Sequence, residues 1–257
     1  SKQCNLAGIE PDLCHTLFMR IFVLSLLLCC PVLAQWLDLS ESNLAICTSA
    51  WEQAITKIIA TDDGGCYVSW FDNRGGGYDV YLQRLDALGN AMWETNGIMI
   101  ADRNYSSTMD FDLAIDASGN AVVVYRQSFL SGDGIVVSSV DPSGTILWNT
   151  TVQGAGSFVA SPVITAINDD VVVGWTSDNV SNFQRLNSEG AMLWSDPPSV
   201  DDPAGGTISV ADIQTSTNGS VIASFVQYTT FWGNKQLKAE RITSDGILVW
   251  EQQVAVM

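Results

Sequence analysis

The nonapeptide Leu85-Asp-Ala-Leu-Gly89-Asn-Ala-Met-Trp93 decides the fold, because it returns three more times along the chain. Every copy has an apolar residue first, a glycine fifth and a tryptophan ninth. The copies begin at residues 85, 140, 186 and 242, and their anchors are Trp93, Trp148, Trp194 and Trp250 with Gly89, Gly144, Gly190 and Gly246. Self-similarity at a fixed period predicts a repeat protein.

A second element precedes each nonapeptide. It is a turn followed by an apolar segment that ends in an aromatic residue, and these aromatics are Trp70, Tyr125, Trp175 and Phe225. The repeat is therefore about 50 residues long. Glycine, Asp and Asn mark the turns, so each unit has the pattern of four short strands. In the first unit we expect strands at 54–60, 66–72, 78–86 and 91–100.

Four antiparallel strands repeated at this period are typical of a β-propeller blade. We predict an all-β β-propeller with four complete four-stranded blades, and the tryptophan after each turn is expected to fill the gap to the next sheet. The blades are expected at about 47–101, 108–153, 159–200 and 207–257. A single stacked β-sandwich is the alternative, but it gives no reason for the pattern to keep its phase.

The segment 36–46 parallels 93–100, because a tryptophan precedes an Asn and an apolar run in both. It is predicted to be an orphan outer strand of one further blade. The first three strands of that blade do not follow within the sequence, so the chain is expected to be an arc of a longer, incomplete propeller.

The N-terminal part is predicted to be a leader. Met19-Arg20, an apolar run and a small residue at position 34 are the three parts of a secretory signal peptide, here 19–34. Residues 1–18 are then expected to lie upstream of the true start, and 35–257 to be the exported part. The apolar run is too short to cross a bilayer, so no membrane span is predicted. A lipoprotein anchored through Cys29 or Cys30 and a buried N-terminal helix are the alternatives.

Composition limits the function. The formal net charge is −17, with 28 acidic and 11 basic residues. This acidity repels phosphate backbones and anionic lipids, so neither a nucleic acid nor a membrane surface is expected as a partner. The single histidine, His15, precedes the predicted leader, and there is no Gly-x-Ser-x-Gly. We therefore predict no catalytic, cofactor-binding or metal-binding residue. A carboxylate-pair glycosidase stays open because acidic residues are plentiful.

Three aromatic residues, Tyr228, Phe231 and Trp232, cluster at one predicted hairpin tip. Exposed rings of this kind suit stacking on a sugar or a protein surface, so they are the candidate ligand contacts. Packing against an adjoining blade is the alternative.

Pairs of acidic residues are the candidate Ca²⁺ ligands, but their spacing matches no calcium loop, so solvated turns are expected instead. The pairs lie at 62–63, 110 and 112, 169–170 and 201–202. Asp72, Arg74 and Asp79 are candidates for lining a polar site, but Arg74 is expected instead to bridge the two carboxylates in a surface pairing. Cys66 begins an apolar strand, which favours a buried thiol there over a disulfide with Cys47, although an exported chain allows that pairing.

The first unit resembles the tandem blade repeats of large secreted bacterial proteins, many of them cell-surface or type IX-exported. The residues that carry the resemblance are Gly64-Gly65-Cys-Tyr-Val-Ser-Trp70-Phe-Asp72-Asn-Arg74, then Asp79-Val-Tyr81-Leu-Gln83-Arg84-Leu-Asp86, and Gly89 with Trp93. The Asp-x-x-Gly-x-x-x-Trp element is also similar to the tryptophan-docking motif of pyrroloquinoline-quinone-type propellers and to the Asp-box of sialidases. The resemblance implies a propeller and export, and no catalytic residue is matched.

These observations favour a secreted or cell-surface propeller that acts as a non-enzymatic binding or display module, with a carbohydrate or a protein as its ligand. One alternative is a polysaccharide-acting hydrolase or lyase that uses Asp or Glu. The other is a structural spacer in a larger multidomain surface protein.

Overall fold

The computed structural model describes most of the repeat region. The described residues are 43–103, 110–154, 158–230, 232–250 and 254–256. The chain divides after Gln35 into two compact units, and everything below concerns the second, which starts at Trp36. The predicted leader (19–34) and upstream segment (1–18) lie outside the described residues. Within those residues, no helix has the length and apolarity needed to cross a membrane.

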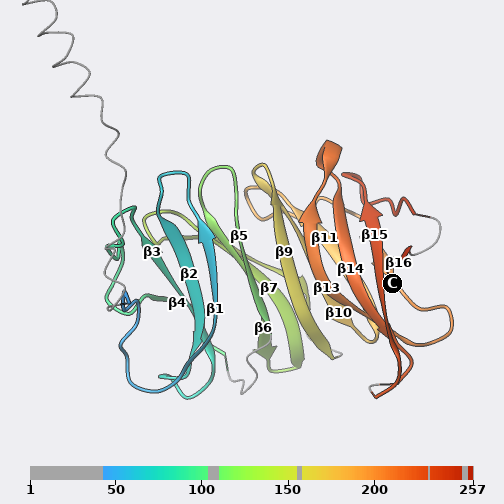
Figure 1. Ribbon diagram of the computed structural model, residues 1–257, viewed down its shortest axis with the longest axis horizontal. Helices are drawn as coiled ribbons and strands as arrows, with labels where there is room; N and C mark the ends of the chain where they lie inside the picture. Colours follow the sequence, from blue (N-terminus) through green and yellow to red (C-terminus); the bar gives the residue numbers. More distant parts are fainter. Residues whose placement is uncertain (1–42, 104–109, 155–157, 231, 251–253, 257) are drawn as a thin grey trace, which may run out of the picture. The chain divides into compact units, whose positions relative to one another are not determined.

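Four antiparallel sheets of four strands each follow one another along the chain (Figure 1). The first holds β1 (Gln53–Ala60), β2 (Cys66–Asp72), β3 (Asp79–Leu85) and β4 (Ile98–Ala101), and the second holds β5 (Phe111–Ile115), β6 (Ala121–Phe129), β7 (Gly132–Val140) and β8 (Ile146–Gln153). The third holds β9 (Val159–Ile167), β10 (Asp170–Ser177), β11 (Val180–Leu186) and β12 (Ser199–Val200), and the fourth holds β13 (Thr207–Thr215), β14 (Val221–Tyr228), β15 (Lys235–Ile242) and β16 (Val254–Val256). The prediction of an all-β chain with four antiparallel sheets is confirmed.

Successive sheets pack face to face through apolar side chains. One core joins Tyr67 and Leu82 of the first sheet to Val123 of the second, and the next two cores join the second to the third and the third to the fourth. The first strands also contact each other in order, β1 with β5, β5 with β9 and β9 with β13. Four sheets stacked in series through their first strands are a propeller-like arrangement, whereas one sandwich would have two sheets.

Burial on both faces explains the sequence of the second strands. All seven residues of β2 are buried, and β6 begins with the buried run 121–125. A strand covered on both faces has no need for a polar face, so its residues are apolar in continuous runs rather than alternately.

The fourth strand of the first sheet is shorter than predicted. It begins at Ile98, whereas the sequence pattern suggested residue 91. Asn96 and Gly97 both have positive φ, and the N–H of Gly97 bonds the carbonyl of Glu94 at 3.0 Å. This turn breaks the extended backbone before pairing with β3 begins.

The predicted orphan strand is not found where it can be checked. Residues 36–42 lie outside the described part, and 43–46 form no strand. The chain crosses the face of the first sheet here, and Thr48 donates its N–H to the side chain of Asn96 at 2.8 Å. Ile46 and Cys47 pack against the buried cluster that contains Trp70. Cys66 is a buried free thiol, as predicted, and Cys47 is also free.

The strands of each sheet begin and end at two opposite sides of the sheet, and these two sides carry different connections. The connections between its first and second and between its third and fourth strands lie at one edge, which we call the turn edge; it carries the glycine turns 86–89, 141–144, 187–190 and 243–246. The hairpin between the second and third strands lies at the opposite edge, called the hairpin edge.

Candidate functional site

The turn edge owes its shape to the residue that opens each nonapeptide turn, which is Asp or Asn in the first three turns and Thr243 in the fourth. The carboxylate of Asp86 accepts the N–H groups of Leu88 at 2.9 Å and Asn90 at 2.8 Å. The N–H of Gly89 bonds the carbonyl of Asp86, and Gly89 has φ +83°. In the next two turns, Asp141 and Asn187 likewise accept the N–H groups of the residues two and four positions further on. Only glycine adopts this left-handed conformation without strain, which explains the fifth position of the repeat.

Each tryptophan then docks on the turn of the following sheet. The indole N–H of Trp93 donates to the carbonyl of Pro142 at 3.1 Å, that of Trp148 to Ser188 at 2.8 Å, and that of Trp194 to Ser244 at 2.9 Å. The acceptor is always the second residue of the next turn. A Cβ added to the turn glycine would lie 3.1 Å from Trp93 at Gly144, 2.6 Å from Trp148 at Gly190 and 3.2 Å from Trp194 at Gly246. Trp250 is described, but no further turn follows it in the described part.

An arginine reinforces two of these docks. Arg84 donates to the carbonyl of Pro142 at 3.2 Å, and Arg185 donates to that of Ser244 at 3.3 Å. Each arginine also forms an ion pair with an Asp of its own sheet, Arg84 with Asp63 and Arg185 with Asp170. The arginine and the tryptophan therefore share one carbonyl acceptor on the neighbouring sheet.

The larger cavity beside such a dock lies between the third and fourth sheets and measures about 480 Å³. Its lining residues are Asp170, Arg185, Leu193, Trp194, Ser195, Asp196, Ser244 and Asp245. Asp196 and Asp245 are exposed, so their carboxylates are accessible from solvent. The described contacts of Arg185 use three of its five N–H groups.

A second cavity of about 300 Å³ lies beside Arg84 between the first and second sheets. It is lined by Ala60, Thr61, Asp62, Asp63, Arg84, Ile115, Asp116, Ala117, Ser118, Gly119 and Pro142. Hydrogen bonds from Thr61 and from the N–H of Gly65 lower the pKa of Asp63, so it stays ionised beside Arg84. The two cavities share an arginine, its partner carboxylate and the second residue of the next turn.

The chemistry of these clefts is that of polar recognition. Carboxylates accept hydrogen bonds from hydroxyl groups, and a guanidinium donates to them. A few convergent polar groups beside apolar surface such as Leu193 are typical of a small-molecule site. Within the described ranges, no group of three or more His, Cys, Asp or Glu is placed to hold a metal ion.

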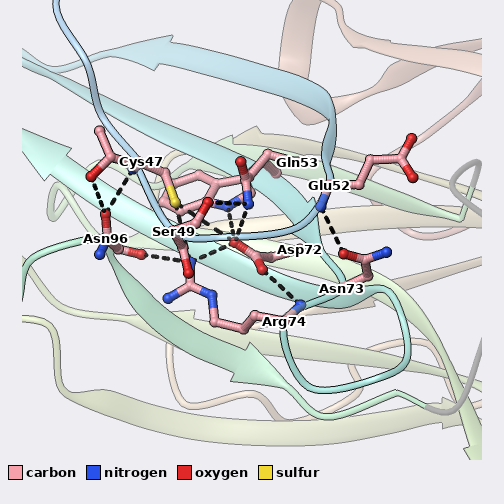
Figure 2. A network of polar contacts seen from close by, with 10 residues as sticks. Cys47, Ser49, Glu52, Gln53, Asp72, Asn73, Arg74 and Asn96 are labelled. Carbon is pink, nitrogen blue, oxygen red and sulfur yellow. Dashed lines mark hydrogen bonds and ion pairs between the residues drawn. The ribbon is translucent and has the colours of Figure 1, made fainter.

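The hairpin edge of the first sheet holds a different polar network (Figure 2). Asp72 is fully buried and accepts hydrogen bonds from Trp70 at 3.1 Å and from Arg74 at 2.5 Å, while Arg74 also reaches the sulfur of Cys47 at 3.2 Å and the carbonyl of Asn96 at 3.1 Å. Burial would raise the pKa of Asp72, but the hydrogen bonds from Arg74 and Trp70 outweigh it and hold that pKa at about 2.

This network corrects one prediction. Arg74 pairs with Asp72 as expected, but Asp79 instead accepts the N–H of Arg103 at 2.7 Å. The reason is that the Arg74 side chain lies over the ring of Tyr81, 4.1 Å from its centroid. The pair is also not a surface pair, because Asp72 is fully buried and Arg74 is partly buried. Its carboxylate is occupied by protein donors, so the network fastens the segment around Cys47 and offers no free ligand site.

Further buried charges lie at the hairpin edge between the first and second sheets. Arg103 is fully buried with its guanidinium 4.6 Å from the centroid of the Phe71 ring, and burial lowers the pKa of Arg103 to about 10. Arg126 pairs with Asp110 at 3.3 Å and with Asp133 at 3.0 Å. Burial raises the pKa of Asp79.

The predicted aromatic contacts are only partly visible. Phe231 lies outside the described residues, Trp232 is 92% exposed, and Tyr228 is half-buried with the Lys235 ammonium 5.6 Å from its ring centroid. Tyr228 and Trp232 belong to the β14–β15 hairpin at the hairpin edge, so the structure does not bring these two residues to the clefts.

Several members of the acidic pairs, which were weighed as calcium ligands and expected in solvated turns, bond to protein groups. Asp112 bonds Lys57 and the N–H of Ile164, and Asp202 accepts the N–H groups of Ala204 and Gly206. Asp63, Asp110 and Asp170 are held in the arginine pairs described above.

Sequence reasoning missed the clefts. Their signal is the Gln-Arg dipeptide, which occurs at Gln83-Arg84 and Gln184-Arg185, one strand before the tryptophan. The glutamine turns its carbonyl oxygen to the N–H of the tryptophan, at 3.1 Å in both sheets, and thereby places the indole beside the arginine.

Comparison with known proteins places the fold among solved structures. No protein-family model matches the chain, and no curated protein matches it. A subtype N10 neuraminidase-like protein of A/little yellow-shouldered bat/Guatemala/060/2010 is similar at a TM-score of 0.52 and 12% identity, covering 79% of this chain and 58% of that chain. An endo-arabinase from Bacteroides thetaiotaomicron is similar at 0.50 and 14%, covering 83% and 84%.

The α-L-arabinofuranosidase Arb93A from Fusarium graminearum is similar at a TM-score of 0.51 and 10% identity, covering 76% of this chain and 63% of that chain. This chain therefore spans less than two thirds of the neuraminidase-like protein and of the arabinofuranosidase. At these identities the similarity concerns the fold, because one fold carries many unrelated functions.

Proposed function

We propose that this chain is a carbohydrate-binding, non-enzymatic β-propeller region of a secreted or cell-surface protein, and that the two inter-sheet clefts are its binding sites. The observation that carries the proposal is a polar cavity beside each of two arginines that contact the next sheet. In both cavities the lining includes the arginine, its Asp partner and the second residue of the next turn.

Sugar chemistry fits such a site. A saccharide presents many hydroxyl groups, and each donates to a carboxylate or accepts from a guanidinium. Asp196, Asp245 and Arg185 supply both kinds of partner at the edge of the larger cleft. Two clefts on one chain would also let a polysaccharide engage both, which raises the apparent affinity without any new contact.

The test is a glycan array followed by titration calorimetry with the sugar that binds. Asp196→Asn and Asp245→Asn should each weaken binding at the larger cleft about tenfold, the loss expected when a hydrogen bond to a charged group is removed. Both residues are exposed, so the fold should be unaffected. Asp178→Asn is the matched control, since Asp178 is exposed at the hairpin edge and has positive φ, which Asn tolerates.

An array on which the wild type binds no glycan contradicts the proposed function. Binding that survives both cleft variants contradicts the assignment of the site.

Polysaccharide cleavage is the second candidate. It is favoured by Asp196 and Asp245, two exposed carboxylates that line the larger cleft together, because glycoside hydrolysis uses a pair of carboxylates. The chain should then release reducing ends from a plant or bacterial polysaccharide, and Asp196→Asn or Asp245→Asn should abolish the release. Absence of products from a broad substrate panel, at enzyme concentrations that show binding, counts against cleavage.

A further inference from the structure

The fourth sheet has one face that no described sheet covers. In the third strands of the first three sheets, Val80, Ile135 and Ser181 are each 0% exposed because the following sheet packs on them. Leu237 stands at the equivalent place in β15, three residues before Glu240, and is 54% exposed. The face of β14 and β15 that carries Leu237 is thus built like a sheet interface.

At the turn edge of the same sheet, Arg241 and Trp250 are already held in place for contact with a further turn. The carboxylate of Glu240 accepts the N–H of Trp250 at 2.8 Å, as Gln184 accepts that of Trp194 at 3.1 Å. Arg241 donates to Ser220 of its own sheet at 3.1 Å, in the way that Arg185 holds Asp170. The arginine and the indole are therefore positioned before anything docks on them.

Two contacts between neighbouring sheets contain both an arginine and a tryptophan, and they show what Arg241 and Trp250 would bind. Arg84 and Trp93 converge on the carbonyl of Pro142, and Arg185 and Trp194 converge on that of Ser244. In both cases the acceptor is the second residue of a turn whose fourth residue is a glycine with positive φ.

We propose that Arg241, Trp250 and the Leu237 face dock a further four-stranded repeat unit, which presents an Asx- or Thr-x-x-Gly turn to the two donors. The established sheet–sheet interface continues in this way across the fourth sheet. The first sheet of a second copy is not the occupant, because its outward face is already covered, with Trp70 2% exposed and Val68 4% exposed.

The test adds such a unit to the chain. Residues 101–153 are appended after Met257, because Met257 stands seven residues after Trp250 as Ile100 does after Trp93. Trp250→Phe keeps an aromatic ring but removes the indole N–H, and it is made in both the original and the extended protein. Trp194→Phe is the matched control, since its dock is complete in both.

The Trp250→Phe substitution should lower the melting temperature of the extended protein by about 2–4 °C, and leave that of the original within about 1 °C. Trp194→Phe should lower both. Equal effects of Trp250→Phe in the two proteins overturn the proposal.

A second measurement does not depend on stability. In protein labelled with 5-fluorotryptophan, the ¹⁹F resonance that Trp250→Phe removes should move on extension. A resonance that stays in place, or an appended unit that remains unstructured, overturns the proposal. A stable dimer of the original chain that Leu237→Asp dissociates also overturns it, because a second copy would then be the occupant.

Discussion

At the scale of the residue, one buried carboxylate shows how charge is kept inside this protein. Asp72 is removed from water, and an ion in that position is tolerated only when it is paired and hydrogen-bonded. Arg74 and Trp70 supply those bonds, and the resulting pKa of about 2 is a measure of how strongly the folded protein prefers the ionised form.

The pKa of Asp72 therefore predicts a pH dependence of stability. The folded-state pKa lies below the unfolded value of 3.8, so this stabilisation is present above about pH 4 and is lost as the pH falls through about 2. The shift corresponds to roughly 2 kcal/mol at about 1.4 kcal/mol per pKa unit. Asp72→Asn should lose this amount at pH 7 and show a flatter stability curve between pH 4 and 2 in urea titrations. A slope identical to wild type in that window would contradict the assignment.

A turn glycine gives a second residue-scale prediction. Gly190 has φ +79°, and an added Cβ would lie 2.6 Å from the Trp148 ring. Gly119 has φ +82° with nothing within 4 Å of an added Cβ. Gly119→Ala should therefore cost only the backbone strain of about 1–2 kcal/mol, and Gly190→Ala should cost more because the docked indole must move. Chemical denaturation of both variants checks the difference, and equal losses would show that Trp148 adjusts freely.

At the scale of the element, the third strands β3, β11 and β15 each organise the tryptophan segment that follows them. The buried Gln184 side chain accepts the N–H groups of Arg185 and Trp194 and donates to the Trp194 carbonyl at 3.0 Å. Residues 192–195 are not part of a long strand, so a side chain supplies the backbone partners that a ladder would provide. Glu240 has the same place in β15 and also accepts two such N–H groups, from Arg241 and Trp250.

Replacing this side chain should loosen the tryptophan segment. Gln184→Leu leaves buried backbone N–H groups without an acceptor, and each costs about 1–3 kcal/mol. Gln184→Glu keeps both acceptor bonds, as Glu240 does, so it should recover part of the loss. Thermal unfolding, with near-ultraviolet circular dichroism to follow the indole, measures both effects. No difference between the Leu and Glu variants would mean that these hydrogen bonds contribute nothing to stability.

At the scale of the whole molecule, the sheets contact their neighbours in sequence order, and acidic residues strongly outnumber basic ones. Such quasi-linear stacking makes stability approximately a sum of sheet terms and nearest-neighbour interface terms. A formal net charge of −17 adds a repulsion that acts on the entire chain. This repulsion disfavours the compact state, and salt screens it.

Stability should therefore rise with ionic strength. Between about 10 mM and 0.5 M NaCl the Debye length falls from roughly 30 Å to a few ångströms, which removes most of the long-range repulsion. The melting temperature is expected to increase by several degrees, measured at a fixed pH near 7. A decrease would show that ion pairs such as Arg185–Asp170 outweigh the repulsion between the acidic residues.

The sequence by itself determined the repeat, the four antiparallel sheets and the left-handed glycine of each turn, because these features are local and recur at a fixed period. It misplaced the start of the strand at Ile98, where positive φ at Asn96 competes with strand pairing. Only the tertiary structure decided the clefts. Arg185 meets the carbonyl of Ser244 from 59 positions away in the chain, and such a contact depends on how two sheets stack rather than on the pattern within either one.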